Sequence, residues 1–158
     1  MDNFAEDLAN LAAENQSPEG FRNRPLWSAN DVVLIACPDN ITIENTLPLQ
    51  SLQIFLAKYF SDTISIVHVL PFFPSTGDDG FSVQNYFEVD KKLGGWIDIG
   101  ELVKHTTLMA DVVLNHCSVK SSWFIGYQNG DPLYENFSCN VSEDFDVSNI
   151  VRTRYSWL

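Results

Sequence analysis

The stretch TISIVHVLPFFPSTGDDGFSVQNY, residues 63–86, decides the fold class of this chain. Its first part, residues 63–70, is mostly β-branched or apolar without strict alternation, which is typical of a parallel strand covered on both faces. Pro71 and Pro74 end this strand, because proline fixes φ and cannot donate a backbone hydrogen bond. The loop over residues 75–80 is polar and contains glycine. α/β proteins place much of their chemistry on loops of this kind.

The same layout recurs later in the chain. The sequence DVVLNH, residues 111–116, predicts a strand over 109–114 that ends at Asn115 and His116. A third strand is predicted at DVVLIAC, residues 31–37, and helices are predicted over 48–60 and 97–108. The first of these helices carries an apolar stripe of Leu49, Leu52, Leu56 and Tyr59.

The predicted order is strand, helix, strand, loop, helix, strand. Strands separated by helices pair in parallel through right-handed crossovers, so their carboxyl ends lie on one side of the sheet. We therefore expect the polar residues after the second and third strands to be neighbours in space.

Three segments are expected. In residues 1–25, Phe4, Leu8, Leu11 and Ala12 recur at helical spacing, which predicts an N-terminal helical segment. Residues 26–120 contain the predicted strands and helices of the main α/β unit. Residues 121–158 mix aromatic residues with Gly, Asn, Asp and Ser without clear periodicity, so we expect an irregular excursion from the sheet.

Composition excludes several classes of protein. The 158 residues are 45% hydrophobic, which is typical of a globular domain. The formal net charge of −12 argues against nucleic acid or an anionic membrane as a partner. Cys37, Cys117 and Cys139 show no CxxC spacing, so neither a disulfide framework nor a metal site is predicted. The acidic first residues lack the features of a signal peptide and no run is long enough to span a membrane, so we expect a cytoplasmic protein.

The candidate site residues each have a structural alternative. Asp79 and Gly80 form a strong turn signal, while Asp78 could accept hydrogen bonds from sugar hydroxyls beside the apolar face of Phe81. A lone histidine at a strand end, such as His116, is more often structural than ligand-binding, although its place directly after Asn115 narrows that difference.

Other polar and aromatic residues fit structural roles. We expect Asp111 to have a structural hydrogen-bonding role and His68 to be packed in its strand. Trp96, Trp123 and Trp157 are compatible with sugar platforms or with core packing. No pair of catalytic carboxylates can be assigned.

Taken in order, four blocks resemble a known family. HVLPFFP at residues 68–74, DDGFSV at 78–83, LGGWID at 93–98 and DVVLNH at 111–116 resemble the N-terminal part of sucrose phosphorylases and their relatives in the α-amylase superfamily, glycoside hydrolase family 13. The resemblance runs from about residue 26 to the end of the chain. Two positions depart from it: Cys37 stands where many relatives have tyrosine, and Asn85 where they often have aspartate.

The resemblance implies the N-terminal part of a (β/α)8 barrel, with about three βα units in residues 26–120 and the start of an inserted, truncated B domain in 121–158. Asp78 and His116 would hold a glucosyl unit, Phe81 would wall it, and Asp111 and Asn115 would support the site. The catalytic carboxylates of the family lie on later strands, so no catalytic residue is expected in this chain and the isolated chain is expected to be inactive.

The implied activity is retaining transfer of an α-glucosyl unit from sucrose or a related α-glucoside to inorganic phosphate, which yields glucose 1-phosphate without metal or other cofactor. Sugar and phosphate are the expected partners, and a homodimer is compatible with the resemblance. Two alternatives stay open. One is a hydrolase or transglycosylase of the same superfamily, and the other is a non-catalytic remnant that binds sugar weakly.

Overall fold

The computed structural model describes residue 10, residues 27–138, and residues 140 and 146. The predicted helical segment with Phe4, Leu8, Leu11 and Ala12 therefore lies outside the described residues, as do Cys139 and Trp157. The described chain contains strands β1 (Val33–Ala36), β2 (Ile66–Val69) and β3 (Thr107–Ala110) and helices α2 (Pro48–Tyr59), α3 (Trp96–Leu102) and α4 (Ser122–Gln128). Two 3-10 turns, η2 (Asp78–Gly80) and η3 (Pro132–Tyr134), complete the regular structure.

The three strands form one parallel sheet in the order β1, β2, β3. Ala36, Val69 and Ala110 are paired across the sheet, so all three strands end at the same level. The predicted order of strands and helices along the chain and the parallel pairing of the strands are confirmed. The polar segments that follow β2 and β3 consequently leave the sheet from one edge.

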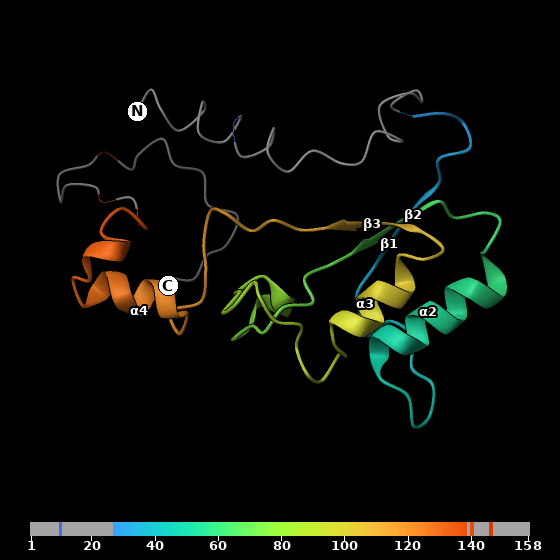
Figure 1. Cartoon of the computed structure of the whole chain (residues 1–158), viewed down its shortest axis with the longest axis horizontal. Helices are drawn as coiled ribbons and strands as arrows, with labels where there is room; N and C mark the ends of the chain where they lie inside the picture. Colours follow the sequence, from blue (N-terminus) through green and yellow to red (C-terminus); the bar gives the residue numbers. More distant parts are fainter. Residues whose placement is uncertain (1–9, 11–26, 139, 141–145, 147–158) are drawn as a thin grey trace.

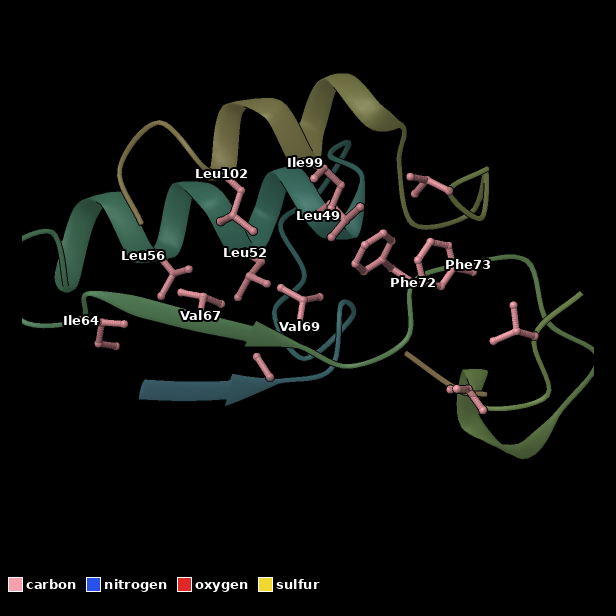
Figure 2. Close-up of a cluster of buried hydrophobic side chains, with 14 residues drawn as sticks. Leu49, Leu52, Leu56, Ile64, Val67, Val69, Phe72, Phe73, Ile99 and Leu102 are labelled. Carbon is pink, nitrogen blue, oxygen red and sulfur yellow. The ribbon is translucent and has the colours of Figure 1, made fainter. Parts of the chain in front are cut away.

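Helices α2 and α3 lie side by side and cover one face of the sheet (Figure 1). Figure 2 shows that Leu52 and Leu56 of α2 point toward β2, while Leu49 lies beside Ile99 of α3. Pro48 starts α2 at a position where a missing N–H is tolerated. The core consists of buried side chains from both helices, β2 and the segment after it, among them Leu49, Leu52, Leu56, Val67, Val69, Phe72, Ile99 and Leu102.

Within the described residues, the opposite face of the sheet is open. Ile35 is 63% exposed and Met109 is 44% exposed, and both lie in the same row across the sheet as His68. The described residues therefore cover the second strand on one face. Its Val67 and Val69 are buried under the helices, while Ile66 and His68 on the other face are only half-buried.

Two predicted boundaries are also wrong. Helix α3 ends at Leu102, not at residue 108, and β3 covers 107–110, not 109–114. The length of β3 follows from its partner: β2 ends at Val69, just before Pro71, so residues beyond Ala110 have no strand with which to pair. The apolar stripe of α2 is confirmed except at Tyr59, which is exposed.

The excursion after residue 120 is more regular than expected. Ser121 caps α4, because its Oγ accepts a hydrogen bond from the Phe124 N–H at 3.2 Å. In Figure 1, α4 lies well apart from the sheet. The segment boundaries at residues 25/26 and 120/121 stay predictions.

Helix α2 provides a test of the core. Replacing Leu52, which is 1% exposed, with Ala should lower the free energy of unfolding by about 2–5 kcal/mol, because a cavity is left under the sheet. Ile54→Ala on the same helix, at a side chain that is 43% exposed, should cost far less. Urea unfolding of both variants measures the difference, and equal losses would contradict this assignment of the core.

Candidate functional site

The loop after β2 folds into a tight hairpin that presents Asp78 at its tip. Ser75 and Val83 form an antiparallel bridge, and the turn between them includes η2. Asp78 and Asp79 have φ values of 58° and 49°, in the left-handed region that Asp tolerates better than most residues. The turn expected at Asp79 and Gly80 is confirmed, and Asp78 is exposed on it.

Gly80 is required at the base of this turn. Its φ is 98°, and a Cβ placed there would lie 2.7 Å from the carbonyl oxygen of Pro71. The proline that ends β2 and the glycine that closes the turn are thus packed together. The backbone that carries Asp78 is held close to the end of the strand.

The segment after β3 carries the other predicted residues. Asp111 follows β3 directly and so lies outside the strand, not within it as the predicted range of 109–114 implied, and Asn115 and His116 lie further along the chain. Both Asn115 and His116 are exposed. Their position is therefore set by side-chain and loop contacts and not by the sheet ladder.

Hydrogen bonds join this segment to the hairpin. The Oγ atoms of Thr76 and Ser118 are 2.7 Å apart, and the Ser118 N–H donates to the carbonyl of Val83 at 2.8 Å. The Tyr86 hydroxyl donates to the carbonyl of Val113. The structure thus brings together the two segments that carry Asp78 and His116, as the parallel sheet predicted.

His68 and Asp111 form a second link between β2 and the end of β3. The His68 Nε2 lies 3.1 Å from the Asp111 Oδ2, and both side chains are largely shielded from solvent. Asp111 has the structural hydrogen-bonding role expected of it. His68 does more than pack in its strand, because it is the partner of that carboxylate.

Aromatic residues connect the hairpin to α4. Tyr86 stacks on Trp123 with ring centroids 5.6 Å apart, and Trp123 also contacts Phe87 and Phe137. Trp96 donates from its Nε1 to the carbonyl of Phe87 at 2.9 Å. Both tryptophans thus have contacts within the protein.

Phe81 and Tyr86 both pack against the buried core next to this hairpin, and both are half-buried. Burial raises the pKa of the Tyr86 phenol, and electrostatic repulsion from the neighbouring Cys117 raises it further. The phenol donates a hydrogen bond to the carbonyl of Val113. Sequence reasoning missed Tyr86, although its place at the end of the DDGFSVQNY block was a usable signal.

A cleft of about 440 Å³ lies at the opposite, amino end of the strands. It is lined by Asn30, Asp31, Asp62, Lys104 and His105 among others, and by none of the predicted site residues. The carboxyl edge is the better candidate, because α/β barrels bind their ligands there. In the described part of the chain, no cluster of three or more His, Cys, Asp or Glu side chains could hold a metal ion, and no helix is long and apolar enough to cross a membrane.

A parallel βαβ sheet with polar residues at its carboxyl edge is common to barrel-type and doubly wound α/β proteins. Residues 59–149 match the model of the family described as alpha amylase, catalytic domain, and the chain belongs to this family. The predicted resemblance and the predicted barrel fold class are confirmed.

The relatives described here are named as phosphorylases. The chain is 44% identical over 128 residues to the glucosylglycerate phosphorylase of Allomeiothermus silvanus. The matched region covers 81% of this chain and 23% of the relative. A glucosylglycerate phosphorylase of Spirochaeta thermophila is also 44% identical, with 78% of this chain and 21% of the relative covered. The crystal structure of sucrose 6F-phosphate phosphorylase from Thermoanaerobacter thermosaccharolyticum superimposes with a TM-score of 0.58 at 37% identity, over 69% of this chain and 21% of that one. The chain thus spans about a fifth of the length of these relatives.

The tight packing of Gly80 can be tested against a glycine of similar backbone conformation. Gly80→Ala and Gly130→Ala should both cost the strain of a positive φ, of order 1–2 kcal/mol. Only Gly80→Ala should lose more, because Gly130 has no atom within 4 Å of the added Cβ. Equal free energies of unfolding for the two variants would contradict the contact with Pro71.

The raised pKa of Tyr86 predicts that stability falls at alkaline pH. The contribution of Tyr86 to the free energy of unfolding is complete when the pH is below 10.0, the ordinary pKa of tyrosine. It is lost as the pH rises through the pKa of the folded state, because the unfolded chain releases this proton more readily. Urea unfolding at about pH 8 and about pH 11 should show a larger decrease for the unsubstituted chain than for Tyr86→Phe. A decrease of the same size in both would argue against a shifted Tyr86.

Proposed function

We propose that this chain supplies the sugar-holding edge of the active site of a glycoside phosphorylase, which transfers an α-glucosyl unit to inorganic phosphate. The observation that carries the proposal is the joining of the Asp78 hairpin to the His116 segment at the carboxyl edge of the sheet. The names of the relatives at 44% identity support phosphorolysis over hydrolysis.

Each residue has a role that its chemistry allows. The Asp78 carboxylate accepts hydrogen bonds from adjacent sugar hydroxyls, and the exposed His116 ring donates or accepts one more. Phe81 offers an apolar face to the sugar ring. Asp111, held by His68, and Asn115 support the segment that carries His116.

The bond-breaking groups belong to the later strands of the barrel. A carboxylate there attacks the anomeric carbon while a carboxylic acid protonates the departing glycosidic oxygen, so the acceptor leaves as an alcohol and a covalent glucosyl-enzyme remains. A phosphate oxygen then attacks this intermediate, and glucose 1-phosphate leaves. The donor in this proposal is sucrose or a related α-glucoside, phosphate is the co-substrate, and no other cofactor takes part.

The proposal places the enzyme in the cytoplasm. Cys37 and Cys117, the cysteines that the described chain contains, are free thiols, which fits a reducing compartment. The net charge of −12 fits a small neutral ligand better than a polyanion.

The test is a hybrid enzyme in which the 128 matching residues of this chain replace the corresponding region of the Allomeiothermus silvanus phosphorylase. With sucrose or glucosylglycerate and inorganic phosphate, it should form glucose 1-phosphate. Asp78→Asn should lower kcat/KM by about 10- to 150-fold, since hydrogen bonds to a charged group contribute about 1.5–3 kcal/mol. Asparagine suits this position because it tolerates the positive φ.

Asp79→Asn is the matched control, on the same turn and with a similar φ. It should change kcat/KM little. Release of free glucose at a rate independent of phosphate would replace phosphorolysis with hydrolysis. Equal effects of the two substitutions would remove Asp78 from its proposed role.

A further inference from the structure

Ser118 is a fully buried polar residue, 0% exposed, at the junction between the hairpin and the segment after β3. Its Oγ lies 2.7 Å from the Oγ1 of Thr76 and accepts a hydrogen bond from the Lys120 N–H at 3.0 Å. Its backbone N–H and carbonyl are bonded to Val83 and Ser121. Every polar group of this residue is therefore used, and none of them reaches solvent.

A buried hydroxyl such as that of Ser118 costs free energy unless it forms hydrogen bonds. An alanine would fill the same dry site without that cost. The hydroxyl of Ser118 meets one side chain from the other segment, Thr76. Thr76 also lies 3.3 Å from the Oγ of Ser82 across the hairpin.

The position of this pair along the chain connects it to the candidate site. Thr76 lies two residues before Asp78, and Ser118 lies two residues after His116. The sheet ladder ends at Val69 and Ala110, well before either site residue. The separation of Asp78 and His116 therefore depends on contacts outside the sheet. Among the side-chain hydrogen bonds that join the two loops in the described residues, the hydroxyl pair lies close to both in sequence.

We propose that Thr76 and Ser118 are positioning residues that fix the distance between Asp78 and His116 and thereby the affinity of the site for a glucosyl unit. Because Ser118 is fully buried, it acts through the loops and not by contact with sugar. The link to sugar affinity rests on the proposed function, whereas the positioning itself does not.

The positioning is read by nuclear magnetic resonance on the isotope-labelled 158-residue chain, with each substitution observed on the opposite segment. Thr76→Val should move the amide resonances of Asn115 and His116, and Ser118→Ala should move those of Asp78 and Asp79. Thr76→Ser keeps the hydroxyl and should leave the amide resonance of His116 unchanged. Thr106→Val removes a hydroxyl that bonds Leu102 far from the site, and it should also leave His116 in place.

The affinity is read in the hybrid enzyme. Thr76→Val should raise KM for the glucosyl donor about 2- to 12-fold with little change in kcat, which corresponds to the loss of one neutral hydrogen bond. Thr76→Ser should restore the original KM.

Unmoved Asn115 and His116 resonances in Thr76→Val would overturn the proposal, as would an equal effect of Thr106→Val. If Ser118→Ala fails to fold, Thr76→Val, at an exposed side chain, still decides. If the resonances move as expected while the hybrid enzyme forms no glucose 1-phosphate, the proposed function fails and the positioning stands.

Discussion

The parallel register of β2 with both of its neighbours is the constraint on which the rest of the structure depends. Val69 pairs with Ala36 on one side and with Ala110 on the other, so the three strands end together. Pro71 stops β2 at this level, and β3 then loses its partner. The chain must leave the sheet at one edge in both places, and that edge is where polar residues follow.

The segment that leaves β3 is tied to β2 and to the loop after it at several successive points. Asp111 bonds His68, the carbonyl of Val113 accepts from Tyr86, and Ser118 meets Thr76. These hydrogen bonds replace the backbone hydrogen bonds that a longer, paired strand would form. They hold an extended segment in place while its Asn115 and His116 side chains stay exposed. A rigid support with exposed polar groups is what a binding site requires.

Local sequence patterns predicted the elements that depend on local chemistry. The leucine stripe of α2 and the turn at Asp79 and Gly80 could be predicted because periodicity and φ preference are properties of neighbouring residues. The end of β3 could not, because it is set by Pro71, which follows the neighbouring strand β2. The role of Ser118 could not either, since its partner lies 42 residues away. Helix α4 could have been found from Ser121, whose side chain caps it.

The free energy of the hydrogen bond between His68 and Asp111 depends on what covers the face of the sheet that the described residues leave open. His68 lies between Ile35 and Met109 in one row across the sheet, and in a closed (β/α)8 barrel this row is part of a packed interior layer. A polar side chain in an apolar layer is unfavourable unless its hydrogen bond is made, and the penalty for an unpaired partner grows as water is excluded. Closing the barrel therefore increases the cost of separating His68 from Asp111. In a closed barrel the start of the His116 segment is thus held more firmly in place.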